Sequence, residues 1–124
     1  MSGFCATCHG NFHTLSGPGG DGIGDDIISP FIRHPTDIVI KNEGEYQFYT
    51  TYDVTAPVGR TTVPDTSSSA VVPGTDVVMC LSCHTAHASD YPDMLRWDYS
   101  QMITATTGPG AGKGCFVCHT QKDG

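Results

Sequence analysis

Three short segments each place two cysteines three positions apart, with a histidine directly after the second cysteine. They are "CATCH" (Cys5 to His9), "CLSCH" (Cys80 to His84) and "CFVCH" (Cys115 to His119). At the C-x-x-C-H spacing, two thiols can add across the two vinyl groups of one porphyrin while the adjacent histidine is held under the iron. A zinc site, a thioredoxin-like redox pair or a structural disulfide would use such cysteines differently.

The repetition of the pattern favours haem over these alternatives. The three segments use all six cysteines of the chain. A zinc ribbon would pair two C-x-x-C units and leave the third without a role, and no thiol remains for a separate disulfide. We therefore predict three covalent haem c groups, with His9, His84 and His119 as proximal iron ligands and with thioether bonds to Cys5, Cys8, Cys80, Cys83, Cys115 and Cys118.

Three further histidines remain for the three predicted haems, namely His13, His34 and His87. This equality predicts bis-histidine ligation, in which each iron has histidine on both faces. Each spare histidine could instead be a surface or a buried structural residue. Methionine also ligates haem iron, so the competing distal ligands are Met79, Met94 and Met102, although methionines near apolar residues more often serve in packing.

The short distance between His84 and His87 indicates that one haem does not use both. Three extended residues span at most about 10 Å, and the thioether bonds hold this segment at the edge of its own porphyrin. We expect His87 to bind the iron attached at Cys5 and Cys8, and His13, by the same reasoning, to bind the iron attached at Cys80 and Cys83. His34 would then serve the haem of Cys115 and Cys118, within one chain or across a subunit boundary.

The composition predicts a single domain over residues 1–124 whose haems form the core. Hydrophobic residues make up 38% of the chain, which also contains 15 glycines and 8 prolines. Few stretches are long and apolar enough to build layers of helix or sheet. We therefore expect a small haem-dominated domain, mostly coil, with few short helices and little β-structure.

Local patterns predict several elements within this coil. Each C-x-x-C-H segment is expected on a helical turn, which keeps both cysteines on one side. Residues 44–54 are the best strand candidate, with a short pairing strand near residues 60–63. Residues 27–40 should be extended because Pro30 and Pro35 interrupt them. One short helix is expected within residues 91–103, and the Gly/Asp loop at 17–26 is a turn, with weak calcium binding as the alternative.

Charge and hydropathy limit the partners and the location. The net charge is −7 with only six lysines and arginines, which argues against nucleic-acid binding. No run of about 20 apolar residues exists, so we predict no membrane span. Haem c is attached outside the cytoplasm, so we expect a signal peptide to have been removed from, or left out of, this sequence. The expected location is extracytoplasmic, secreted or at the cell surface, with the periplasm as the alternative.

The C-x-x-C-H segments and the residues around them resemble the multihaem c-type cytochromes with doubled C-x-x-C-H motifs. This group includes cytochrome c3-like and extracellular multihaem proteins. The resemblance rests on "CATCHGNFH", "IRHPTD", "VVMCLSCHTAHASDYPDMLRWDYS" and "GCFVCHTQKDG". Such proteins are exported electron carriers with bis-histidine haems, and several extracellular members polymerise into filaments. The resemblance implies electron transfer to redox partner proteins or an extracellular acceptor.

We expect electron transfer through three closely packed haems, in a chain that self-associates into an extracellular cytochrome filament. The alternatives are a soluble periplasmic carrier and a haem reductase with an open iron site. A reductase of small oxyanions would favour a basic cluster, but the six basic residues are scattered along the sequence. We therefore expect no enzymatic activity and name no catalytic residue.

Overall fold

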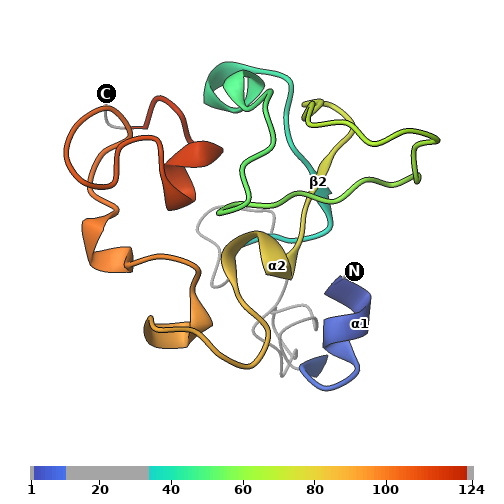
Figure 1. The fold of residues 1–124 in the computed structure, drawn as a ribbon, viewed down its shortest axis with the longest axis horizontal. Helices are drawn as coiled ribbons and strands as arrows, with labels where there is room; N and C mark the ends of the chain where they lie inside the picture. The colour runs from blue at the N-terminus through green and yellow to red at the C-terminus, as the bar shows by residue number, and fades with distance from the viewer. Residues whose placement is uncertain (1, 11–33, 123–124) are drawn as a thin grey trace, which may run out of the picture.

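The computed structural model describes residues 2–10 and 34–122, and most of this part of the chain is coil (Figure 1). Predictions for His13, for the loop at 17–26 and for residues 27–33 lie outside the described residues. The described elements are two short α-helices, two short strands and four 3-10 helices: α1 (Ser2–Ala6), β1 (Ile38–Val39), η2 (Gly44–Phe48), β2 (Val77–Val78), α2 (Cys80–Cys83), η3 (Pro92–Met94), η4 (Tyr99–Gln101) and η5 (Gly114–Val117). The prediction of mostly coil with few short helices and little strand is confirmed.

All three C-x-x-C-H segments begin on a helical turn, as predicted. Helix α1 contains Cys5, α2 runs between the two cysteines of the second segment, and η5 contains Cys115. A helical turn brings residues three and four positions apart onto one side. The sequence spacing and the local backbone therefore agree at each segment.

A small antiparallel sheet leads directly into the second segment. Ile38 pairs with Val78 and Val39 with Val77, and α2 begins two residues after β2 ends. Gly59 adds a bridge on the other side of Val77, with backbone N–H···O distances of 2.9 Å in both directions. Paired backbone on both sides of β2 fixes the chain that enters the second motif.

The strand predicted for residues 44–54 is wrong. Gly44–Phe48 forms η2, and Thr51 makes only an isolated bridge with Ala70. Tyr49 turns inward instead, where its hydroxyl donates to the Ala56 carbonyl at 2.8 Å and accepts from the Asp53 N–H at 3.2 Å. These bonds fold the chain back, which prevents an extended run. The pairing strand near residues 60–63 is likewise absent from the described structure, where the neighbouring bridges lie at Gly59 and Ala70.

The single helix predicted within residues 91–103 is also wrong. Two separate 3-10 turns, η3 and η4, occupy this segment. Asp93 and Met94 have φ of +57° and +54°, a left-handed conformation that ends a right-handed helix. The second turn begins where the Asp98 carboxylate accepts from the Ser100 N–H at 3.0 Å.

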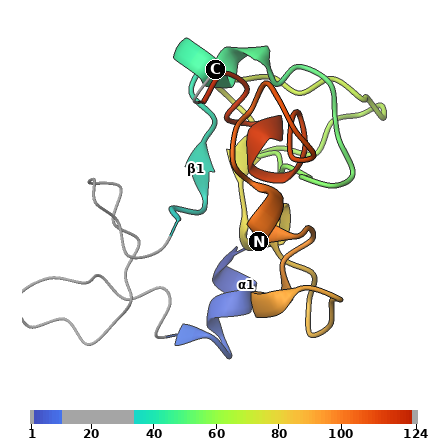
Figure 2. The same ribbon diagram turned by 90° about the vertical axis from the view of Figure 1, so that its left-hand side faces the viewer.

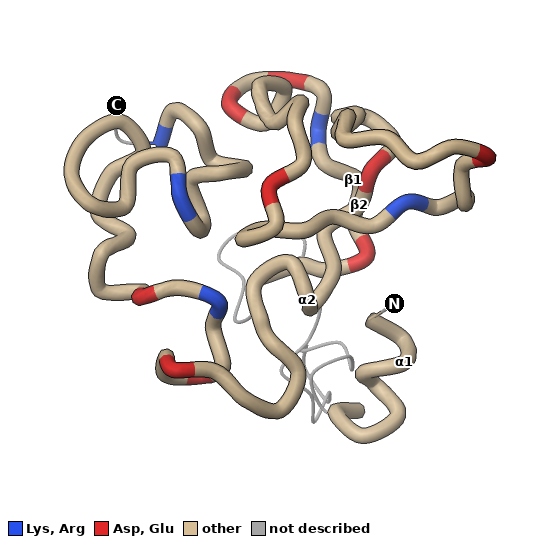
Figure 3. The backbone as a smooth tube through the Cα atoms, in the orientation of Figure 1, with Lys and Arg blue, Asp and Glu red and all other residues tan. Residues whose placement is uncertain are grey.

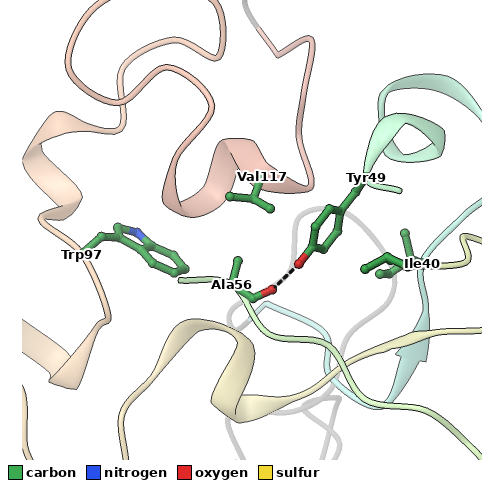
Figure 4. Packing of buried hydrophobic residues seen from close by; sticks show 6 residues of the cluster. Ile40, Tyr49, Ala56, Trp97 and Val117 are labelled. Carbon is green, nitrogen blue, oxygen red and sulfur yellow. Dashed lines mark hydrogen bonds between the residues drawn. The ribbon is translucent and has the colours of Figure 1, made fainter. Parts of the chain in front are cut away.

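A small cluster of protein side chains forms a core among the described residues (Figure 4). Its buried members are Ile40, Tyr49, Ala56, Val71, Trp97 and Val117. Val117 belongs to the third motif, and Cys83, Cys115 and Cys118 pack against the cluster from partly buried positions. The second and third motifs are therefore anchored in this protein core. That haems complete the core remains a prediction.

Candidate haem-binding sites

The three motifs share one hydrogen bond that closes the turn. In each, the histidine N–H donates to the carbonyl of the first cysteine, at 2.9 Å for His9, 3.0 Å for His84 and 3.0 Å for His119. The turn therefore has the same closure in segments of different surrounding sequence. Two thiols and an imidazole on one closed turn are the residues that covalent haem attachment requires, so the residues present fit that group.

The first and second motifs lie side by side, with α1 packed against α2 (Figure 1). Ser2, which is fully buried, accepts a hydrogen bond from the Cys80 N–H at 3.3 Å through its hydroxyl. In the free thiol form, the pKa of Cys5 is raised by burial and then by the charge and hydrogen bond of Cys80. The first cysteines of the two motifs are therefore neighbours.

The second and third motifs are also neighbours. Burial raises the pKa of the free Cys83 thiol to about 12, and the charges of Cys115 and Cys118 add to the effect. Burial likewise raises the pKa of Cys118 to about 11. Cys83, Cys115 and Cys118 also pack against the same core cluster, whereas the Cys80 N–H bonds to Ser2 beside the first motif. The second motif lies between the other two, an order that the sequence could not establish.

Trp97 packs directly against the third motif. A Cβ built on Gly114 would lie 2.8 Å from Trp97 Cγ, so only glycine allows this approach. Trp97 Nε1 is buried and has no hydrogen-bond partner among the described residues. Burial raises the pKa of Cys115, and the nearby indole N–H opposes this shift. Because sulfur is a weak acceptor, this contact does not satisfy the indole.

His84 is oriented by a backbone carbonyl. Its Nδ1 lies 2.8 Å from the Asp93 oxygen, and since a carbonyl can only accept, Nδ1 carries the proton. Nε2 is then the nitrogen with a lone pair for a metal. Residues 93–96 run along the second motif, where Thr85 N–H donates to Met94 and Arg96 N–H to Cys83, both at 2.9 Å. The segment predicted as a helix therefore positions His84, the predicted proximal ligand, instead.

His119 is oriented by a carboxylate. Its Nδ1 lies 3.1 Å from Glu45 Oε1, and its ring meets the Tyr46 ring edge-to-face with centroids 5.1 Å apart. Thr120 adds a second link, because its hydroxyl donates to the Glu45 carbonyl at 2.5 Å. Figure 2 shows η2 beside the C-terminal segment that carries this motif. Sequence reasoning missed Glu45, which it assigned to a strand.

His34 lies next to His119. The two ring centroids are 6.2 Å apart and the ring planes are inclined by 85°. Metal–histidine bonds are about 2 Å long, so imidazoles on opposite sides of one metal have centroids about 6 Å apart. His34 Nδ1 is 2.9 Å from the Pro35 carbonyl and donates to it. The structure therefore places this predicted pair of ligands next to each other, while their binding to one iron remains a prediction.

The positions of the other predicted axial ligands do not by themselves indicate ligation of an iron. His9 and His87 are exposed, and His87 has a left-handed backbone with φ of +63°. His13 lies outside the described residues. Among the methionine alternatives, Met102 packs against the core cluster and Met94 is exposed. Axial ligation by each of these residues remains a prediction.

The described residues contain neither a cluster of metal-binding side chains nor a membrane-spanning helix. No group of three or more histidine, cysteine or acidic side chains there is arranged to hold a metal ion. A haem iron needs only two axial protein ligands. No helix in this part of the chain is long and apolar enough to cross a membrane.

Comparison with known proteins supports the prediction that the C-terminal part of the chain binds haem c. Residues 73–124 match the family model described as the doubled CXXCH motif. No curated protein and no solved structure matches the chain. The match covers the second and third motifs, leaves out the first, and does not address the cytochrome c3-like grouping. Residues 73–124 therefore carry the doubled CXXCH motif of multihaem c-type cytochromes, as the sequence predicted.

Proposed function

We propose that this chain is a single trihaem domain that transfers electrons outside the cytoplasm. The observation that carries the proposal is the common turn, in which His9, His84 and His119 each close onto the first cysteine of their motif. The family match covers two of these turns, and the first has the same spacing and the same closing bond. Each bound haem would supply one reversible one-electron iron couple.

The arrangement of the motifs supports closely packed haems. Helix α1 packs against α2, and Cys83, Cys115 and Cys118 pack against one core cluster, so the second motif neighbours both of the others and the attachment points form a row in sequence order. Short separation between cofactors is what rapid electron transfer requires. A row of attachment points has two ends, and these lie in α1 and in η5.

The distal ligands that we propose are His34, His87 and His13. The spacing of the His34 and His119 rings supports His34 on the haem of Cys115 and Cys118. The contact between α1 and α2 supports a reciprocal exchange, with His87 on the first haem and His13 on the second. With bis-histidine ligation at all three irons, no position stays open for a substrate.

An anion reductase is the weaker candidate. Figure 3 shows the basic residues of the described chain on separate loops. Lys41 and Lys122 do line one open hollow of about 670 Å³, but Glu43 and Glu45 line it too. Two carboxylates offset the two ammonium groups, so this hollow offers an anion no net attraction.

For the assembled state, we propose a subunit of an extracellular cytochrome filament. Attachment sites at both ends of the row would allow haem-to-haem contact between neighbouring subunits. Several large apolar side chains are also exposed, among them Phe4 (78%), Val63 (95%) and Ile103 (70%). Exposed apolar surface marks interaction sites when it is contiguous. A soluble periplasmic carrier is the alternative.

Intact-protein mass spectrometry after acid–acetone extraction tests the haem count. We expect the mass of the polypeptide plus three haems, and a mass with fewer haems would contradict the proposal. An optical spectrum with only low-spin bands would support full bis-histidine ligation, whereas a high-spin band in the native protein would favour the reductase. Electron microscopy of the native preparation separates filaments from a dispersed monomer.

A further inference from the structure

The hydrogen-bond acceptor of His119 Nδ1 differs in charge from the hydrogen-bond acceptor of His84 Nδ1. His119 Nδ1 faces the Glu45 carboxylate at 3.1 Å, whereas His84 Nδ1 faces the neutral carbonyl of Asp93 at 2.8 Å. His34 also donates to a neutral carbonyl, that of Pro35. Between His84 and His119, it is His119 that faces a side chain with a full negative charge.

The Glu45 carboxylate is held in place by its surroundings. Its side chain is 21% exposed and that of His119 is 26% exposed, so water screens the pair only in part. Thr120 donates to the backbone carbonyl of Glu45, and Tyr46 packs against both the core cluster and the His119 ring. Helix η2 is thus joined to the third motif by three independent contacts.

A carboxylate acceptor changes how strongly an imidazole donates electrons. It draws the Nδ1 proton towards itself and increases the electron density at Nε2. Greater donation and a nearby negative charge both favour ferric over ferrous iron. Hydrogen bonding to a haem ligand is one of the means by which a protein sets the haem potential.

We propose that Glu45 is a positioning residue that lowers the reduction potential of the haem at Cys115 and Cys118. That haem then has a lower potential than the haem at Cys80 and Cys83, whose proximal histidine has a neutral partner. This inference rests on the proposed function, since it requires haem at both motifs.

The variant Glu45→Gln tests the role of the charge in the haem-loaded protein. Glutamine keeps an oxygen that can accept from His119, so the orientation is retained while the negative charge is lost. Hydrogen bonds to charged groups are roughly twice as strong as those between neutral groups. We expect the oxidised-to-reduced ratio of one haem, at a fixed solution potential, to fall about tenfold, which equals about 59 mV for one electron.

Glu43→Gln is the matched control. It removes the same charge two residues away, where the side chain is 75% exposed and pairs with Lys41 at 3.8 Å. Because solvent screens this position, we expect a much smaller shift. Spectroelectrochemical titration measures both variants, and electron paramagnetic resonance of the ferric protein gives a second readout. Only Glu45→Gln should change the low-spin signal of one haem, because only it alters the imidazole.

Equal shifts in the two variants, with three low-spin haems still attached, would overturn this inference and leave the proposed function intact. A wild-type mass without a third haem would instead contradict the proposed function. If the Glu45→Gln variant does not incorporate haem, an NMR-monitored redox titration of the unaltered protein determines the order of the two haem potentials instead. The haem at Cys115 and Cys118 is recognised by contacts of its thioether protons with Phe116 and Val117, and the haem at Cys80 and Cys83 by contacts with Leu81 and Ser82. At each solution potential, the haem at Cys115 and Cys118 must be the more oxidised of the two. The reverse order contradicts the inference.

Discussion

His34 and His119 come from opposite ends of the described segment 34–122, yet their rings lie 6.2 Å apart with their planes nearly perpendicular. Each ring uses Nδ1 for a hydrogen bond, His34 to Pro35 and His119 to Glu45. In both rings, Nδ1 therefore carries the proton. Helix η2 creates this arrangement, because it holds the C-terminal motif beside the chain that enters β1.

Replacing His34 with alanine should leave one haem high-spin. Thioether attachment does not involve His34, so we expect three haems by intact mass. The haem that changes should be that of Cys115 and Cys118, since His119 would keep its iron from one side only. Optical and electron paramagnetic resonance spectra measure the change. An unchanged low-spin spectrum would exclude His34 as a ligand.

Replacing His87 with alanine should also produce one high-spin haem, but at Cys5 and Cys8. His87 has a φ of +63°, which glycine adopts without the penalty that other residues incur. His87→Gly is therefore a control that removes the imidazole and relieves the backbone. Both variants should show the same spin change, with His87→Gly unfolding at the higher denaturant concentration. High-spin iron at Cys80 and Cys83 instead would show the predicted exchange of ligands to be wrong.

Gly114→Ala should destabilise the protein by about 2 kcal/mol or more. Its φ is +55°, and an added Cβ would lie 2.8 Å from Trp97 and from the Met102 sulfur. Gly112→Ala is the matched control, since φ is +64° there but no atom lies within 4 Å of the new Cβ. It should show only the backbone penalty of about 1 kcal/mol. Denaturant unfolding of both haem-loaded variants measures the difference, and equal losses would contradict the packing of Trp97 on the third motif.

Tyr49 should make the stability of the protein depend on alkaline pH. Its side chain is 3% exposed, and burial raises its pKa to about 12. The folded state therefore favours the neutral phenol. This contribution is complete below the unfolded pKa of about 10 and is lost as pH rises through about 12. A difference of two pKa units between the folded and unfolded states corresponds to at most about 3 kcal/mol in the free energy of unfolding.

Tyr49→Phe tests this dependence. At neutral pH we expect a loss of about 1 to 2 kcal/mol, because the Ala56 carbonyl and the Asp53 N–H lose their buried partner. The difference in unfolding free energy between the wild type and this variant should shrink between pH 10 and 12. Tyr99→Phe, at a side chain that is 67% exposed, is the control and should change little. A constant difference across this pH range would contradict the prediction for Tyr49.

The sequence by itself determined the attachment chemistry and the irregular fold. Two cysteines and a histidine within one turn are close in space whatever the rest of the chain does, so Cys80, Cys83 and His84 could be assigned from spacing alone. The high glycine and proline content excluded long regular elements for a similar local reason. These features depend on covalent geometry and short-range sterics, which residues close together in the sequence determine.

Only the tertiary structure decided what surrounds each motif. Residues 44–48 became η2 rather than a strand because Tyr49 bonds back to Ala56 and Glu45 meets His119. Residues 91–103 did not form one helix because Asp93 and Met94 turn left-handed and bond to the second motif. The contact of Glu45 with His119 joins segments far apart in the chain, and so does the position of the His34 ring beside His119, a partnership that the sequence predicted only by elimination. Such contacts are selected by burial and hydrogen bonding over the whole fold, and no local pattern encodes them.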